Sequence, residues 1–331
     1  MFSYRSILKQ ALNIAWGYKY LWVFGLFAAI AAASGAYEYQ FLINSFQVSA
    51  LESSYFHLGI FLAILEAIGL FLIGLVRVFS YDFVTILNTL TAIIILFLLA
   101  ASFIWLSITS QAALVFVSKK AIVAKKRLSE MPISDGLTEG HKHFWRVLAL
   151  NVVIHVTIAI ILSLISIPLI FMAERGSEYL AVIYTLGFII FIPLAISLSL
   201  IVRYAIAFRV LENTGFYLSI KKAWQLFFKN WLISIEMGIL LFFINFLAGF
   251  VILFSLGILI WPYFIFALDY GFGLLAALLA GIALIIIILF GSFLTTFQIS
   301  AWTGLFLELK NNRGEAKLER VFKKKTKKSK K

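Results

Sequence analysis

The chain has 331 residues, of which 63% are hydrophobic and only 13% are charged, and its 28 Lys and Arg outnumber its 15 Asp and Glu. A mean hydropathy of +1.03 excludes a water-soluble globular protein. The apolar stretches are too long for the strands of an outer-membrane barrel, so the composition favours a polytopic helical membrane protein. Because the chain has no cysteine, disulfides, thiolate metal sites and a cysteine nucleophile are also excluded.

Lysine and arginine are concentrated in four zones, which are residues 1–19, 119–146, 203–229 and 310–331. The connections between these zones carry acidic residues instead, among them Glu38 and Glu174. By the positive-inside rule, the basic zones face the cytoplasm. The charge pattern therefore predicts a multi-pass protein of the cell (inner) membrane with both termini in the cytoplasm.

A short amphipathic helix is predicted three times, at residues 8–19, 137–148 and 219–231, each time directly before a long apolar segment. The third copy, SIKKAWQLFFKNW, has apolar residues at helical spacing and lysines on the opposite face. We expect these three interfacial helices to lie flat in the membrane interface, where lysines meet anionic lipid. The aromatic residues expected at headgroup depth are Trp16, Trp145, Trp224 and Phe228.

An internal repeat is indicated because a small residue precedes an aromatic residue by five positions in each interfacial helix. The pairs are Ala11 with Trp16, Gly140 with Trp145, and Ala223 with Phe228. The alternative is a chance match, because amphipathic helices commonly precede membrane helices.

The fold class that follows is an all-α polytopic membrane protein built from three repeats of an interfacial helix plus a transmembrane hairpin. The expected repeats are 4–36 with 83–118, 134–210, and 217–308, which together form one membrane domain over 1–308 with six core transmembrane helices. Those helices are expected at 21–36, 83–117, 147–173, 179–208, 231–260 and 272–308. The N-terminal part also resembles a secretory signal, but its cleavage would remove one copy of the repeat.

Residues 37–82 make the first repeat longer than the others, and they are interpreted as an insertion. Two full crossings between residue 55 and the basic loop at 119–127 would place that loop outside, against the charge rule. The hydrophobic segment 55–79 is therefore expected to enter the membrane without crossing it, or to lie along its surface. A seventh crossing is the alternative.

Residues 309–331 are expected to form a disordered polybasic cytoplasmic tail, because this lysine-rich segment cannot bury an apolar face. Such a tail attracts anionic lipid. Nucleic acid would be bound by the same chemistry but is not the partner we expect, and a purely solubilising role is an equal alternative.

Three motifs resemble the membrane domain attached to some bacterial glycerophosphodiester phosphodiesterases and its stand-alone, uncharacterised multi-pass relatives. They are ALNIAWGYKYLWVFG at 11–25, EGHKHFWRVLALN at 139–151 and SIKKAWQLFFKNW at 219–231. The resemblance implies a six-helix membrane domain of unestablished role. It does not imply phosphodiesterase activity, because that catalytic barrel requires a separate domain of about 250 residues.

Polar residues inside apolar helices are costly, so they mark candidate sites. The residues of this candidate polar membrane site are Gln111, Asn151, His155, Arg203, Glu236 and Gln298. We expect Gln111, Arg203 and Gln298 to converge if the repeats pack about a pseudo-threefold axis. Arg203 is expected either to pair with Glu236 or to extend to the interface as an anchor.

The sequence predicts a protein that is not an enzyme, with no catalytic, cofactor or metal site. Asn151 and His155 are more typical of an interhelical hydrogen-bonding pair than of a catalytic one. We expect a non-catalytic lipid-interacting or scaffold protein of the inner leaflet, bound to membrane lipids and above all to anionic lipid. The alternative is a transporter or permease-like protein whose cytoplasm-facing polar vestibule takes a small solute or anion.

Overall fold

A computed structural model describes residues 3–33, 83–124, 133–173 and 180–311, together with a few positions between 66 and 74. Within these residues the chain is helical apart from short connections, so the all-α prediction is confirmed. Almost all of the insertion at 37–82 and of the polybasic tail lies outside the described residues, and so does much of the segment 55–79.

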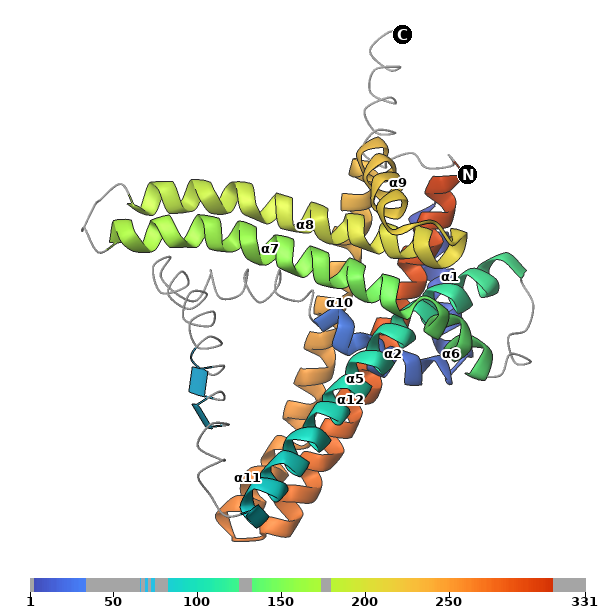
Figure 1. The fold of residues 1–331 in the computed structure, drawn as a ribbon. Helices are drawn as coiled ribbons and strands as arrows, with labels where there is room; N and C mark the ends of the chain where they lie inside the picture. Colours follow the sequence, from blue (N-terminus) through green and yellow to red (C-terminus); the bar gives the residue numbers. More distant parts are fainter. Residues whose placement is uncertain are drawn as a thin grey trace, which may run out of the picture. The chain divides into compact units, whose positions relative to one another are not determined.

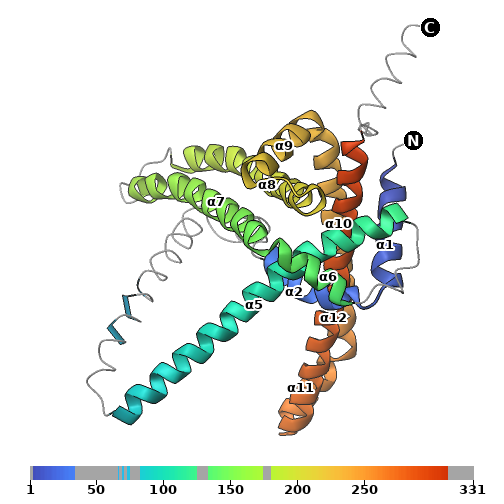
Figure 2. The same ribbon diagram turned by 45° about the vertical axis from the view of Figure 1, so that its right-hand side comes forward.

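The chain divides into two compact units. Unit 1 comprises Met1–Ala32, Ser107–Leu148 and Leu200–Lys331. Unit 2 comprises Ala33–Leu106 and Ala149–Ser199. It holds the parts of two helices, α7 (Phe144–Ala173) and α8 (Leu180–Glu212), that run side by side in Figures 1 and 2.

Each predicted interfacial helix is present as a short helix, with one to three residues between its end and the apolar helix that follows. The pairs are α1 (Tyr4–Gly17) with α2 (Leu21–Ala33), α6 (Ile133–Lys142) with α7 (Phe144–Ala173), and α9 (Phe216–Lys229) with α10 (Trp231–Leu259). The break arises where the strongly amphipathic pattern gives way to continuous apolar sequence, because the two patterns require different surroundings.

The second interfacial helix is shorter than predicted, since α6 ends at Lys142 and not at residue 148. His143 forms the turn: its N–H donates to the Gly140 carbonyl at 3.1 Å, and the next helix begins at Phe144. Gly136 and Gly140 lower the helix propensity of this segment. Trp145, which was expected on the interfacial helix, consequently lies in the first turn of α7.

Three further long helices are α5 (Phe83–Ala124), α8 (Leu180–Glu212) and α12 (Gly273–Lys310). Among the described residues, four stretches are long and apolar enough to cross a membrane. They are Phe83–Val123, Pro193–Glu212, Trp231–Leu259 and Gly273–Lys310. The number of six transmembrane helices and the repeat architecture therefore stay predictions.

The hairpin of α10 and α12 is closed by a further short helix, α11 (Trp261–Asp269), where the sequence had indicated only an aromatic connection. Figures 1 and 2 show α10 and α12 side by side, with α11 across their end. Pro262 stands at the start of α11, where its missing N–H costs nothing. Gly271, with φ of 74°, supplies the left-handed residue that turns the chain into α12.

The core of unit 1 lies where α12 runs from Ser292 to Leu309, at the end of the unit that carries the clustered lysines and arginines, here called the basic end. α1 packs against α12, and the Tyr204 hydroxyl of α8 shares a hydrogen bond of 2.8 Å with Ser234 of α10. Gly25 of α2 permits a close approach, because a Cβ there would overlap the backbone of Ser292. Packing of several helices thus holds the basic end together.

Candidate functional site

The interfacial helix α9 has three faces, where the sequence predicted two. Ser219, Ala223 and Phe227 are buried against the protein. Trp224 and Phe228, one position further around the helix, are 48% and 53% exposed. The predicted single apolar face is thus divided, since half of it packs on protein and the other half is left for another apolar medium.

The first interfacial helix, α1, is divided in the same way. Ala11 and Ala15 are buried, whereas Leu12 and Trp16 are exposed. The Trp16 ring lies edge-on to Phe293 of α12 at 5.8 Å between centroids. In α1 the exposed aromatic residue therefore lies beside the helix that carries the core of unit 1.

The small and aromatic residues of the proposed repeat have matching environments. All three small residues are buried, namely Ala11, Gly140 and Ala223. All three aromatic residues are exposed, namely Trp16, Trp145 and Phe228. Gly140 brings α6 onto α5, because a Cβ at this position would overlap the Thr109 carbonyl oxygen.

Arg203 and Glu236 of the candidate polar site have different partners. The Arg203 guanidinium carbon lies 5.1 Å from the centroid of the Trp302 ring, which is a cation–π contact. The Glu236 carboxylate accepts a hydrogen bond of 2.5 Å from the Tyr4 hydroxyl. The half-buried Arg203 thus lies beside an aromatic ring, and Glu236 is bound by a hydroxyl group. The expected Arg203–Glu236 pair stays a prediction.

The other candidate polar residues are distributed over both units. Gln111 and Gln298 are half-buried in unit 1. Asn151 is buried and lies in unit 2, where the side chain of His155 is outside the described residues. The small residues two positions after the expected convergence points, which are Ala113, Ala205 and Ser300, are all buried. Ser300 shares a hydrogen bond of 2.9 Å with Ser118, so α5 and α12 are in contact near that level.

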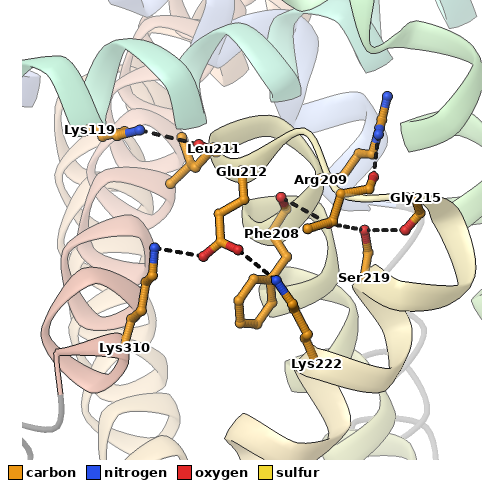
Figure 3. A network of polar contacts seen from close by, with 10 residues as sticks. Lys119, Phe208, Arg209, Leu211, Glu212, Gly215, Ser219, Lys222 and Lys310 are labelled. Atoms are coloured by element: carbon orange, nitrogen blue, oxygen red, sulfur yellow. Dashed lines mark hydrogen bonds and ion pairs between the residues drawn. The ribbon is translucent and has the colours of Figure 1, made fainter.

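A polar network that the sequence did not indicate lies at the end of α8, at the basic end (Figure 3). The Glu212 carboxylate forms ion pairs with Lys222 of α9 at 2.9 Å and with Lys310 of α12 at 2.7 Å. The carboxylate is mostly buried, and both lysines are partly open to solvent. Glu212 thus ties the interfacial helix α9 to the end of α12.

The connection from α8 to α9 is held from within by side chains. The Arg209 guanidinium, which is 2% exposed, donates to the Thr214 carbonyl. The Thr214 hydroxyl shares a hydrogen bond of 2.6 Å with Ser219 in the first turn of α9. Asn213 adopts a left-handed φ of 54°, which asparagine tolerates better than most residues. The interfacial helix is therefore fixed in direction at its start.

A pocket of about 460 Å³ lies between the ends of α5, α6 and α8 and the first turn of α7. Its polar wall consists of Lys119, Glu139, Lys142, His143, Arg146 and Asn213. Lys142 is paired with Glu139 at 2.7 Å, and Lys119 donates to the Leu211 carbonyl at 3.2 Å. Three cations and one carboxylate thus surround this pocket.

His143 is the most buried ionisable residue of the pocket wall, being 5% exposed. Burial lowers its pKa, and the cations Arg146 and Lys142 act in the same direction, against the opposing attraction of Glu139. Its Nε2 lies 3.7 Å from Glu139 Oε1, and its Nδ1 is buried without a hydrogen-bond partner in the described structure. The imidazole is therefore neutral around pH 7.

Sequence reasoning missed this pocket because its residues come from three separate segments of the chain, 116–119, 139–146 and 210–213. The run HKHFWR was interpreted only as part of an interfacial helix. No family model, curated protein or solved structure matches this chain. The class of protein is therefore defined by the fold alone: an all-α chain whose apolar helices are compatible with insertion in a membrane.

Proposed function

We propose that this protein is a non-catalytic, multi-pass protein of the inner membrane that contacts anionic lipid of the inner leaflet through its interfacial helices. The observation that carries the proposal is the divided apolar face of α9, with Ala223 and Phe227 on the protein and Trp224 and Phe228 exposed. Such a helix lies at a bilayer surface when its exposed apolar side chains reach the acyl chains.

Lysines stand beside the exposed aromatic residues of α9, which favours a negatively charged surface. Lys221 and Gln225 are exposed on the face next to Trp224 and Phe228. Lys222, which we expected at the headgroups, is instead engaged by Glu212. Each lysine near an anionic surface contributes about 1 kcal/mol, so α9 and the polybasic tail together form the proposed lipid contacts.

The repeat architecture belongs to this proposal too. Matching burial of the small residues and matching exposure of the aromatic residues support three equivalent interfacial helices. The six-helix membrane domain, and its relation to the phosphodiesterase-associated membrane domains, are proposed on the same grounds. A transport function is less favoured, because Arg203 and Glu236, two residues of the candidate polar membrane site, each have a separate partner.

The lipid contact is tested by depth measurement, which the absence of native cysteine makes straightforward. Trp224→Cys and Lys221→Cys are each labelled with an environment-sensitive fluorophore in nanodiscs that contain brominated lipid. We expect strong quenching at position 224 and weak quenching at position 221, because the two residues belong to adjacent faces. Equal and weak quenching at both positions would show that α9 does not reach the acyl chains.

The dependence on anionic lipid is tested by placing negative charges on the exposed apolar face of the same helix. Trp224→Glu combined with Phe228→Glu is expected to release anionic lipid from the purified protein, as measured by mass spectrometry of retained lipid. Gln225→Glu is the matched control, since it adds one charge on the polar face. Loss of anionic lipid in the control alone, or in neither variant, contradicts the proposal.

The membrane orientation is tested by labelling single cysteines in intact cells with an impermeant maleimide. A cysteine at Tyr270, beside the end of α11, is expected to react, and one at Asn213, in the connection before α9, is not. Reaction at position 213 from outside would reverse the proposed orientation of the basic zones.

A further inference from the structure

The pocket at the basic end has more positive charge than its own carboxylate neutralises. Glu139 is taken by Lys142. Lys119 uses one of its three donors on the Leu211 carbonyl, and Arg146 forms no ion pair with any described carboxylate. Two cations of the pocket wall, one from α5 and one from α7, thus have no carboxylate partner among the described residues.

His143 supplies an independent indication that this pocket has a ligand. A side chain that is 5% exposed and has an unpartnered Nδ1 loses a hydrogen bond that water would have given it. A ligand oxygen in the pocket would accept a hydrogen bond from the N–H at this nitrogen. The buried, unsatisfied group is therefore explained by an occupant with oxygen acceptors.

The helix termini around the pocket also indicate which charge a ligand would carry. α7, a helix of 30 residues, begins at Phe144, so its N-terminal turn lies at the pocket and favours an anion. The opposing end is the C-terminus of α8, whose Leu211 carbonyl is already satisfied by Lys119. The electrostatic balance is therefore positive.

We propose that this pocket binds a phosphate monoester group, held by Lys119 of α5, by Arg146 and the first turn of α7, and by His143. A monoester carries close to two negative charges at neutral pH, which matches the two unneutralised cations. The volume of about 460 Å³ lies within the range of small-molecule sites. The group belongs either to a lipid headgroup, which would deepen the proposed lipid function, or to a soluble phosphate.

The test is thermal unfolding of the full chain in neutral detergent, with chloride at the same ionic strength as the reference. Two arms separate the sources: inorganic phosphate, and a short-chain phosphatidic acid with phosphatidylglycerol, a diester, as its control. We expect the midpoint of unfolding to rise with phosphate, with phosphatidic acid, or with both. A response to phosphate alone assigns a soluble ligand, and a response to phosphatidic acid alone assigns a lipid.

Variants place the effect in the pocket. Lys119→Gln and Arg146→Gln are each expected to weaken the apparent affinity about tenfold, because each removes a charge-assisted hydrogen bond. Lys120→Gln is the matched control, since this neighbouring lysine is exposed and does not line the pocket. Wild-type protein that responds no more to phosphate and phosphatidic acid than to chloride, or an equal loss in Lys120→Gln, overturns the proposal.

Protonation of His143 provides a second readout, with sulfate as a probe because its charge does not change around neutral pH. Glu139, Lys142, Arg146 and Lys119 are the charged residues that surround the imidazole. A bound dianion stabilises the imidazolium, so sulfate should bind more tightly at mildly acidic pH than at mildly alkaline pH. His143→Gln should remove this dependence, and a dependence that persists there contradicts the role of His143.

If a variant does not fold, the lipid ligand can still be tested by measuring which lipid the wild-type protein retains. Native mass spectrometry in an equimolar mixture should then show phosphatidic acid retained over phosphatidylglycerol. Equal retention, with no stabilisation by phosphate, removes the proposed ligand. The depth measurement on α9 is independent of this pocket, so the lipid function can stand if the ligand fails, and the ligand can stand if that function fails.

Discussion

The two halves of α12 show how differently one helix can be used. From Ser292 to Leu309 its side chains enter the core of unit 1, and Leu305 is completely buried. Between Gly273 and Leu289 many large apolar side chains are exposed, and Leu274 is 79% exposed. Both halves are continuous helix, so the contrast lies entirely in what surrounds them.

Tertiary packing in unit 1 is concentrated at the basic end. Polar side chains such as Ser300 and Thr303 are buried there, and the Glu212 network lies at the same end. In the apolar half, acyl chains can satisfy leucine and isoleucine as well as protein can, so no helix has to cover them. Mutations at the basic end should therefore cost more than similar mutations in the apolar half.

The largest difference is expected from introducing leucine at Gly25 of α2, beside the packed half of α12, and at Gly281, in its apolar half. Gly25→Leu would push into the backbone of Ser292 and cost roughly 3 kcal/mol or more. A Cβ added at Gly281 would meet nothing within 4 Å, and Gly281→Leu gains helix propensity. Thermal unfolding in detergent measures both, and a Gly281→Leu variant as unstable as Gly25→Leu would show that the apolar half is also tightly packed.

A smaller loss is expected from Glu212→Gln, which leaves Lys222 and Lys310 without their shared carboxylate. Because both lysines are partly exposed, water compensates for part of the loss, and the cost should be about 1 kcal/mol. Denaturation of the variant beside Lys222→Met and Lys310→Met tests the network. Costs that simply add across the double variants would mean that the three groups do not interact.

Removal of a single hydrogen bond gives the next smaller effect. Tyr204→Phe deletes the hydroxyl that binds Ser234 and should cost about 0.6 kcal/mol, the average for interhelical hydrogen bonds in membrane proteins. Tyr263→Phe, at an exposed position of α11, is the control and should be neutral. Thermal unfolding of the two variants in parallel measures the difference, and equal stability would show that the Tyr204 hydroxyl contributes nothing.

The partner of Arg203 is tested with two double-mutant cycles. Arg203→Gln and Trp302→Leu should be coupled by roughly 0.5–1 kcal/mol, because the cation lies over the ring. Arg203→Gln and Glu236→Gln should have additive costs, since Glu236 is bound by Tyr4. Coupling in the second cycle and none in the first would support the ion pair predicted from the sequence.

The smallest effect is the pH dependence that His143 adds to stability in a phosphate-free buffer. Its folded-state pKa is lowered by burial, so the unfolded chain binds the proton first as the pH falls. Stability is therefore complete above the ordinary pKa of about 6.5 and declines below it. His143→Gln should flatten this decline in unfolding temperature, whereas His141→Gln at an exposed position should leave it unchanged.

The helical class, the apolar helices and the three short helices before them could be predicted from the sequence alone. Continuous hydrophobicity and helical spacing are local properties, so they predict a helix without reference to any partner. The same patterns located the buried small residues, because Ala11, Gly140 and Ala223 share a face with their apolar neighbours.

Only the tertiary structure decided which neighbour each face meets. Phe227 packs on protein and Phe228 does not, although both are apolar and adjacent. Arg203 lies beside the Trp302 ring, and α6 ends at Lys142 after its glycines contact α5. In a membrane, lipid and protein offer an apolar side chain nearly equal environments, so periodicity cannot distinguish them. The pocket, assembled from three separate segments of the chain, is visible only once their helices are packed.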